Sequence, residues 1–487
     1  MPAHSLDMSK PPPCPPARSA WRSAALPYLA TGCLISVLLT WVFVVHLCQW
    51  QLPLKWDSHA FVLMARWWLN FGLWPYADTV ELKPPGIFLY LVGLWSIFPM
   101  AMWPVRIVDT LLAAAGAIAV FVAVEGSRPA RLVASLWFAY WQHHGLLDIG
   151  GLYTEQYVAI FAALAWATRR RPWLAGVLAG VGMSFKHVGA SVLLPLCLSG
   201  AWMAVPVAAL TFLASLLPWA VSGRGTAAWE IVMVQAWRYG RWPWNDVQGL
   251  TRMVVELTQR GGWLLLPLMI ATVAVACLRP TRERAILLIW WLCECTLVAM
   301  QRGWAYHQMI PTLTPTALLI GSVIHALPLR FVTAALLSGF IVVQVRPAVV
   351  QSEWRNLRAG RWPEGPSPTA AEQVGRWLAE QAKPTDTLHV IVPHGDDPAV
   401  YWYAGLRPAA GRYWHPYLGW NAPALSPWPK QFAALEGASW IVEWGTFDPK
   451  LRPSFPDLTA RCYQLARTFA ADAAVKVWQR REACLSN

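Results

Sequence analysis

Apolar residues occupy long uncharged stretches along most of the chain. No Asp, Glu, Lys or Arg occurs in residues 23–54, 188–223 or 303–329. A helix of about 20 apolar residues covers the ~30 Å hydrocarbon core of a bilayer, so each of these windows is long enough to cross one. The pattern therefore predicts a polytopic α-helical membrane protein.

The same pattern predicts about 11 transmembrane helices, several of them shorter than a full span. We expect them at residues 24–50, 107–124, 132–143, 156–168, 173–185, 188–200, 201–221, 263–278, 285–301, 308–325 and 331–350. The apolar run 84–105 is expected to lie at the membrane interface or to insert halfway. The reason is the orientation of the helices that follow it, which the basic clusters described next indicate.

Three clusters of basic residues indicate that orientation. They are Arg128 with Arg131, the run 169–171, and the group Arg279, Arg282 and Arg284. If the run 84–105 does not cross, all three clusters face the cytoplasm, as the positive-inside rule requires; a full crossing would turn all three outward. The tail 1–23 is then cytoplasmic and disordered. The transmembrane domain 24–350 exposes its loops 51–106 and 222–262 outside, together with the C-terminus.

The tail 351–487 has the composition of a separate soluble domain. A capping pattern from Thr369 to Glu372 opens an amphipathic helix, and residues 387–392 and 439–444 have the pattern of short buried strands. We expect a small α/β extracytoplasmic domain. Cys462 and Cys484 either pair as a disulfide in that compartment or remain separate buried thiols.

Composition supports the membrane class and excludes nucleic-acid binding. Hydrophobic residues make up 56% of the chain and charged residues 13%, whereas soluble domains carry about 25% charged residues. The net charge of +13 comes from short basic clusters between apolar segments rather than from one basic face. The 33 Trp and 13 Tyr suit membrane interfaces and stacking on sugars. Neither the Cys residues nor adjacent His143 and His144 have zinc-type spacing.

The first outer loop holds the richest group of polar residues. Asp57 follows the first predicted transmembrane helix and opens another helix, so it either caps that helix or acts, partly desolvated, as a general base. Lys83 either extends to the interface or holds a phosphate as a point charge. The Pro84-Pro85-Gly86 sequence ends the loop and fixes the direction of Lys83.

Other candidates lie at outer ends of the predicted helices. Glu155 opens a helix, where it either favours the helix dipole or takes part in chemistry. Lys186 lies at a break between two apolar runs, and Arg302 lies at a helix junction that also carries Tyr306 and His307. Charges at membrane depth are costly and commonly functional. With the lysine of the first loop, these cations would surround an outer-leaflet cavity suited to an anionic lipid headgroup.

The layout of these residues resembles the GT-C superfamily of membrane glycosyltransferases, in the branch of protein O-mannosyltransferases and the lipid A aminoarabinose transferase. The resemblance rests on Trp56-Asp57, on the segment from Asp78 through Glu81 to Lys83-Pro84-Pro85-Gly86, and on Glu155. Lys186, the segment from Arg302 to His307, and residues 401–403 are weaker matches. The similarity extends over the predicted transmembrane part and more loosely over the tail.

The resemblance implies a glycosyltransferase that passes a sugar from a polyprenyl-phosphate donor to an envelope acceptor, which is a lipid, glycan or protein. It implies inversion with Asp57 as base and Glu155 as a second catalytic acid. The substrate-binding residues that it implies are Asp78, Glu81, Lys83, Lys186, Arg302, Tyr306 and His307. Relatives often carry a second acidic residue after the first, and this chain has Ser58 there. No cofactor is therefore implied with certainty, and a divalent cation stays open.

Two other functions stay open at this point. A transporter or flippase of a lipid-linked sugar needs the same cations, but it would place charges along a path through the membrane. A non-enzymatic membrane subunit, with the α/β tail as its working part, would tolerate replacement of Asp57 and Lys83. We expect a multi-pass protein of the bacterial inner membrane, with the N-terminus cytoplasmic, the C-terminal domain periplasmic or extracellular, and membrane lipids around it.

Overall fold

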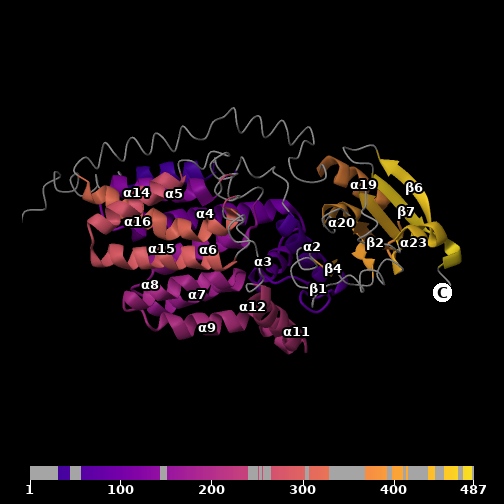
Figure 1. Ribbon diagram of the computed structural model, residues 1–487, viewed down its shortest axis with the longest axis horizontal. Coiled ribbons are helices and arrows are strands. Elements are labelled where there is room, and N and C mark those ends of the chain that lie inside the picture. The colour runs from indigo at the N-terminus through magenta and orange to yellow at the C-terminus, as the bar shows by residue number, and fades with distance from the viewer. Residues whose placement is uncertain are drawn as a thin grey trace, which may run out of the picture.

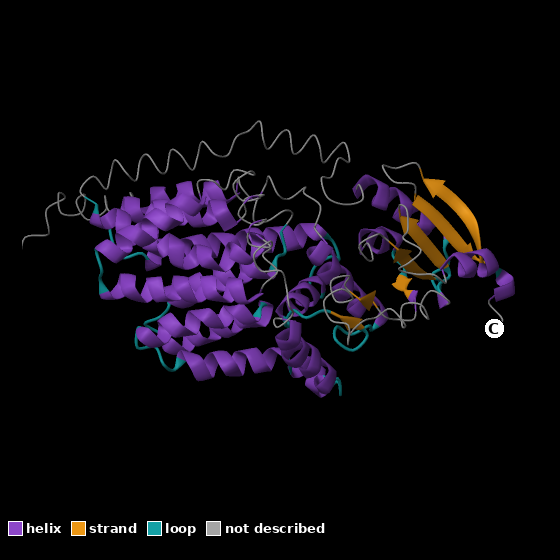
Figure 2. Cartoon of the chain, viewed as in Figure 1, coloured by secondary structure: helices purple, strands orange, loops and turns teal. Residues whose placement is uncertain are grey.

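A bundle of helices forms one part of the molecule and a mixed β-sheet forms the other (Figure 1 and Figure 2). The computed structural model describes residues 31–43, 46, 56–142, 151–239, 251, 255, 265–301, 306–327, 368–391, 398–409, 413–414, 437–444, 455–469 and 475–484. The predictions for residues 1–23, His143, His144, Arg302 and residues 331–350 concern positions outside these ranges.

Apolar helices build the bundle, since a helix satisfies its own backbone hydrogen bonds and leaves apolar side chains to pack. They are Thr31–Phe43, α4 (Met102–Ala123), α5 (Arg128–Gln142), α6 (Thr154–Ala167), α7 (Pro172–Phe185), α8 (Leu193–Leu198), α9 (Ala204–Ser215), α10 (Leu217–Val221), α14 (Leu265–Leu278), α15 (Arg282–Gln301) and α16 (Leu313–Ala326). Two 3-10 helices, η1 (His187–Val192) and η4 (Tyr306–Thr312), lead into α8 and α16.

Helical structure occurs in each predicted crossing that the structure describes, with different bounds. Helix α4 begins at Met102 and so takes in the end of the run 84–105. The predicted helix 201–221 divides at Leu216. Pro218 lacks the backbone N–H that a continuous helix would need there, and it lies instead in the first turn of α10. Within the described residues, two helices, Met102–Ala123 and His307–Ala326, are long and apolar enough to cross a bilayer. Thr31–Phe43, Gly86–Trp95, Pro172–Phe185, His187–Leu198 and Ala204–Ser215 are apolar but shorter.

Small residues let α7 and α9 approach closely. A Cβ atom on Gly176 would lie 2.7 Å from the Ala204 carbonyl oxygen, and one on Gly180 would lie 2.6 Å from the Ala208 carbonyl oxygen. Small residues spaced in this way on one helix face are common where apolar helices pack against one another in a membrane, since water there does not drive them together.

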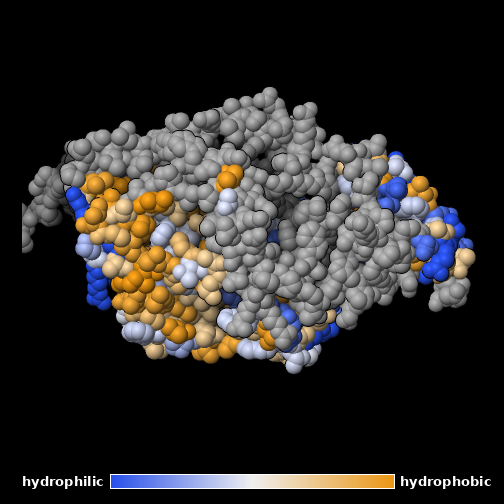
Figure 3. Space-filling model, in the orientation of Figure 1, coloured by the Kyte–Doolittle hydropathy of each residue, from blue (hydrophilic) through white to orange (hydrophobic). Residues whose placement is uncertain are grey.

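The outside of the bundle is apolar too. Hydrophobic side chains gather over the bundle and hydrophilic ones over its far end and over the sheet (Figure 3). Leu111, Leu210 and Leu278 are 63%, 67% and 81% exposed, respectively. An apolar surface of this kind indicates contact with lipid or with another protein.

Short elements lie between the bundle and the sheet (Figure 1). They are α2 (Trp56–Phe71), β1 (Thr79–Val80), α3 (Gly86–Trp95), α11 (Gly225–Trp229), the π-helix η2 (Glu230–Gln235) and α12 (Ala236–Tyr239). The predicted run 84–105 is therefore one short helix, α3, followed by the start of α4. These elements surround the candidate site.

The C-terminal part is a five-stranded mixed sheet in the order β3-β2-β5-β7-β6. Its elements are α19 (Pro368–Gln381), β2 (Thr387–Ile391), α20 (Pro398–Ala404), β3 (Arg407–Pro408), β5 (Trp440–Trp444), α23 (Phe455–Cys462), β6 (Tyr463–Phe469), β7 (Val475–Arg480) and η7 (Glu482–Cys484). The strands predicted at 387–392 and 439–444 are confirmed as β2 and β5, which pair in parallel with Leu388 opposite Trp440.

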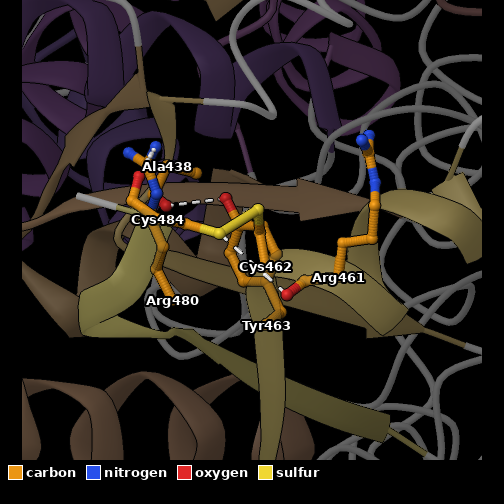
Figure 4. Close-up of a disulfide and its surroundings, with 6 residues drawn as sticks. All are labelled: Ala438, Arg461, Cys462, Tyr463, Arg480 and Cys484. Atoms are coloured by element: carbon orange, nitrogen blue, oxygen red, sulfur yellow. Dashed lines mark hydrogen bonds between the residues drawn. A yellow bond between two sulfur atoms is a disulfide. The ribbon is translucent and has the colours of Figure 1, made fainter. Parts of the chain in front are cut away.

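A disulfide joins Cys462, at the end of α23, to Cys484 in η7 (Figure 4). The hydroxyl of neighbouring Tyr463 donates a hydrogen bond of 2.8 Å to the Ala438 carbonyl oxygen and ties this corner to the sheet. Of the two alternatives for these cysteines, the structure has the pairing. Disulfides are typical of proteins outside the cytosol.

The C-terminal part docks on α2 through α20. Arg66 Nη1 donates a hydrogen bond of 2.6 Å to the Trp402 carbonyl oxygen, and its guanidinium lies 4.7 Å from the centre of the Trp402 ring. Trp67 Nε1 donates to the Leu406 carbonyl oxygen at 3.3 Å. A second link is the parallel pairing of β1 with β4 (Tyr413–Trp414). The C-terminal part therefore contacts the segments that carry Asp57 and Lys83.

Candidate active site

Helix α2 places Asp57 in its first turn, where a carboxylate is favoured by the helix dipole. Asp57 Oδ2 lies 3.8 Å from Lys83 Nζ, and Glu81 Oε1 lies 3.5 Å from the same nitrogen. The Asp57 and Lys83 side chains keep 20% and 23% of their surface exposed. In this first cluster of Asp57, Glu81 and Lys83, Asp57 and Lys83 are thus accessible to a ligand, whereas the Glu81 side chain is 6% exposed.

Hydrogen bonds within the loop fix the position of Lys83. Asp78 Oδ2 accepts from the Trp74 backbone N–H at 2.8 Å, so this predicted substrate-binding residue shapes a turn. The Tyr76 hydroxyl donates to the Lys83 carbonyl oxygen at 2.7 Å. Glu81 Oε1 accepts from the Leu82 backbone N–H at 2.9 Å. The loop is therefore ordered by its own polar groups.

Gly86 seats this loop against the end of α7. A Cβ atom on Gly86 would lie 2.6 Å from the carbonyl carbon and oxygen of Ser184 and 2.9 Å from the Phe185 nitrogen. No side chain fits against backbone at that distance. The glycine that follows the two prolines thus brings the Lys83 loop beside the residue that precedes Lys186.

A second cluster contains Glu155, Lys186 and His307. Glu155 lies in the first turn of α6 and is 1% exposed. Lys186 ends α7 with an extended backbone and its Nζ pairs with Glu155 Oε1. Thr154 Oγ1 donates to the other carboxylate oxygen at 3.0 Å, and His307 Nε2 lies 3.7 Å from Oε1. The carboxylate of this cluster is enclosed.

Tyr153 is a member of this cluster that sequence reasoning missed. Its ring stacks on His307 with centroids 4.7 Å apart and planes at 17°. Tyr153 is 5% exposed. Its only sequence signal is its place two residues before Glu155, which does not distinguish a structural aromatic residue from a functional one.

The two clusters belong to one electrostatic site. The charge of Lys83 acts on Glu155 as well as on its own cluster, and that of Asp57 acts on Lys186 and His307. The structure therefore brings together six of the predicted site residues from distant segments. Arg302 and the side chain of Tyr306 lie outside the described residues.

The residues at Asp57 do not form a metal site in the described part of the chain. No group of three or more His, Cys, Asp or Glu side chains there has the geometry to hold a metal ion. Asp57 faces Lys83, and the Ser58 hydroxyl donates to the Gly151 carbonyl oxygen at 2.7 Å. The position that follows Asp57 therefore supplies a hydrogen-bond donor rather than a second carboxylate.

His59, one turn into α2, is kept neutral. Burial and the nearby positive charge of Arg106 lower its pKa from 6.5 to about 4. Both causes disfavour the imidazolium form. The first turn of α2 therefore carries the Asp57 carboxylate and no positive charge at neutral pH.

Two further carboxylates lie in the bundle away from these clusters. Asp109 Oδ1 accepts hydrogen bonds from the hydroxyls of Tyr90 at 2.9 Å and of Tyr157 at 2.6 Å. Glu294, for which the sequence indicates no partner, accepts from the Ser191 hydroxyl and, at 3.1 Å, from Trp290 Nε1. Polar partners of this kind reduce the cost of burying a carboxylate.

No family model matches the chain, and no curated protein sequence matches it significantly. By structure it is similar to ArnT from Cupriavidus metallidurans bound to undecaprenyl phosphate, with a TM-score of 0.59 and 15% identity over 96% of this chain and 99% of that one. Apo ArnT gives a TM-score of 0.60 and 15% identity over 93% and 98%. The arabinofuranosyltransferase AftD from Mycobacteria aligns at 0.46, with 14% identity over 91% and 41%.

The ArnT matches extend over nearly the whole of both chains. They therefore show that this chain has the ArnT fold, which is mostly helical with a C-terminal mixed sheet. The fold is the one that the sequence resemblance to GT-C enzymes implies.

Proposed function

We propose that this protein is a membrane glycosyltransferase that moves a sugar from a polyprenyl-phosphate donor to an envelope acceptor. The observation that carries the proposal is the meeting of Asp57 and Lys83 with Glu155 and Lys186, on an ArnT fold. An ArnT structure of this fold contains undecaprenyl phosphate. A phosphate diester on an apolar chain needs cations beside an apolar surface, and both occur here.

The proposed step is an in-line displacement at the anomeric carbon. An acceptor oxygen forms the new bond to that carbon, and the bond from the carbon to the phosphate oxygen breaks with its electron pair. Asp57 takes the acceptor proton as general base. Lys83, with Lys186 behind it, stabilises the negative charge on the departing polyprenyl phosphate. The configuration at the anomeric carbon is inverted.

Glu155 has a supporting role in this scheme. Its carboxylate is enclosed by Lys186, Thr154 and His307, so it cannot reach an acceptor hydroxyl without breaking those contacts. It instead holds the Lys186 ammonium in place. The Lys186 side chain is then fixed in one rotamer that faces the donor phosphate. A charge fixed in place before the reaction stabilises the transition state, because it need not reorient during the chemical step.

The proposed location is the inner membrane, with about 11 crossings and this site on the outer side. The loops that carry the three basic clusters meet: Arg169 pairs with Glu125 at 2.9 Å and lies 3.6 Å from Glu283. Arg279 Nη1 donates to the Ala326 carbonyl oxygen at 3.0 Å. All three clusters thus lie at one end of the bundle, and α6 leads from there to Glu155 at the other.

The C-terminal part is proposed to shape the donor loop and to cap the cavity beside the acceptor. Strand β1 lies between Asp78 and Glu81, and it pairs with β4 with Thr79 opposite Tyr413. Since Lys83 follows this strand closely, the C-terminal part helps to set where the lysine lies.

The test is transfer of a radiolabelled sugar from polyprenyl-phosphate donors to envelope acceptors in membranes that contain the purified chain. We expect transfer by the wild type and at least a tenfold loss in Lys83→Ala, since one preorganised cation is removed. Lys383→Ala, which removes an exposed lysine of the C-terminal part, is the matched control and should transfer normally.

A chelator added to the same assay tests the metal question, and we expect no loss of transfer. If no donor yields labelled product, or if Lys83→Ala equals the wild type, the proposed site is wrong. Movement of the donor across the membrane without sugar transfer would instead favour the transporter.

A further inference from the structure

The turn that delivers Glu155 has a strained backbone. Gly151 and Leu152 both have left-handed conformations, with φ of 80° and 65°. Leu152 is 0% exposed, so its side chain is fixed in the core. A bulky residue with positive φ is strained and persists only where its surroundings impose it.

Contacts from two sides impose this turn. Ser58, which is 0% exposed, donates its hydroxyl proton to the Gly151 carbonyl oxygen at 2.7 Å. On the other side a Cβ atom on Gly151 would lie 2.6 Å from Arg106 Nη1, so a side chain there would displace the guanidinium, and the φ of 80° also favours glycine. The turn is therefore enclosed between α2 and α4.

The Ser58 hydrogen bond joins the two carboxylate-bearing helices. Ser58 follows Asp57 directly in α2, and Gly151 lies just before the first turn of α6 that carries Glu155. This buried hydrogen bond thus links the segment with the more exposed acid to the segment with the enclosed one.

We propose that Ser58 is a positioning residue, and this inference rests on the proposed function. Ser58 holds the Gly151–Leu152 turn in place. Asp57 and the pair Glu155–Lys186 can then face one substrate. A carboxylate at this position could not donate to the Gly151 carbonyl oxygen and would be drawn to Arg106. Where relatives often carry a second acidic residue, Ser58 therefore supplies a fixed hydrogen bond to the Gly151 backbone instead.

The experiment compares Ser58→Ala and Ser58→Cys with Ser135→Ala. Ser135 is the matched control, because it is also 0% exposed and donates to a backbone carbonyl, that of Arg131, at 2.9 Å. Ser58→Cys has the same shape with a slightly larger atom and a weaker donor, so it leaves no cavity and guards against simple misfolding. Two quantities are measured: hydrogen exchange of the peptide from residue 151 to residue 157, and kcat with KM for the polyprenyl-phosphate donor.

In Ser58→Ala we expect faster exchange in this peptide, a kcat lowered about 10- to 100-fold, and a donor KM changed less than about threefold, because misplacement of reacting groups affects the chemical step. Ser58→Cys should be intermediate and Ser135→Ala should equal the wild type. Unchanged exchange in Ser58→Ala would overturn the link, and faster exchange with unchanged kcat would overturn the positioning role. If the wild type transfers no sugar from any donor, the proposed function fails, and exchange alone decides whether Ser58 holds the turn.

Discussion

The site contains two pairs of one lysine and one carboxylate, and they differ in exposure. In the first, Lys83 and Asp57 side chains are 23% and 20% exposed and lie 3.8 Å apart. In the second, Lys186 and Glu155 are 13% and 1% exposed and make a direct hydrogen bond. We call them the open pair and the closed pair.

The difference indicates separate tasks. An exposed ion pair is worth about 0–1 kcal/mol, so a phosphate can take the place of Asp57 beside Lys83 at little cost. A buried pair loses several kcal/mol when one partner is removed, so Glu155 and Lys186 stay together. The open pair therefore suits proton transfer and exchange of ligands, and the closed pair suits a fixed positive charge.

The largest expected effect comes from breaking the closed pair. Glu155→Gln leaves the Lys186 ammonium buried without its counter-ion, and we expect a loss of about 3 kcal/mol in stability. Thermal unfolding in detergent measures it, with Glu230→Gln, an exposed glutamate of the outer region, as control. The double variant Glu155→Gln with Lys186→Met should recover most of the stability but not the transfer activity. Equal unfolding temperatures for Glu155→Gln and wild type would contradict the closed pair.

A somewhat smaller effect should follow from moving the open pair relative to the closed one. In Gly86→Ala the new methyl group meets the Ser184 backbone, so the Lys83 loop must move away from Lys186. We expect transfer to fall about 10- to 100-fold. Gly93→Ala, in the same helix with open space around its Cα, is the control. Normal transfer by Gly86→Ala would show that the two lysines need not be held together.

Loosening the C-terminal part should affect the open pair more mildly. Arg66→Ala removes the hydrogen bond to the Trp402 carbonyl oxygen and the contact with its ring, together worth about 1.5 kcal/mol. Faster hydrogen exchange in α20, with Arg481→Ala as the exposed control, measures the loss. Exchange that stays at the wild-type rate would mean that other contacts hold the docking.

The smallest effect concerns acid pH and α2. Because the pKa of His59 is lowered to about 4 in the folded chain, the unfolded chain binds more protons between pH 4 and 6.5. This stability is complete above pH 6.5 and is lost as the pH falls, by roughly 1–2 kcal/mol at pH 5 and by more toward pH 4. His59→Gln should lose less stability than the wild type between pH 7 and pH 5 in thermal unfolding. Identical losses would show that His59 is not the group that titrates.

Sequence reasoning predicts the elements better than the contacts. Long apolar runs predict the bundle helices, and short apolar runs predict β2 and β5 as buried strands, because burial alone determines those patterns. Asp57, Lys83, Glu155, Lys186 and His307 are recognisable as charges at helix ends. Their pairing is not, since it depends on how close Gly86 and Ser184 approach in three dimensions. Ser58 and Tyr153 are chemically ordinary and gain their place only from the fold.

The most direct test of the central claim is a single-turnover experiment with Asp57→Asn, in which the enzyme is in excess of the bound polyprenyl-phosphate sugar. The variant should bind the donor within about threefold of the wild type, because the cations remain, and should transfer the sugar at least about 100-fold more slowly, because the base is gone. Its stability should match that of the wild type, unlike that of Glu155→Gln. Transfer at the wild-type rate by Asp57→Asn would contradict the assignment of the open pair to proton transfer.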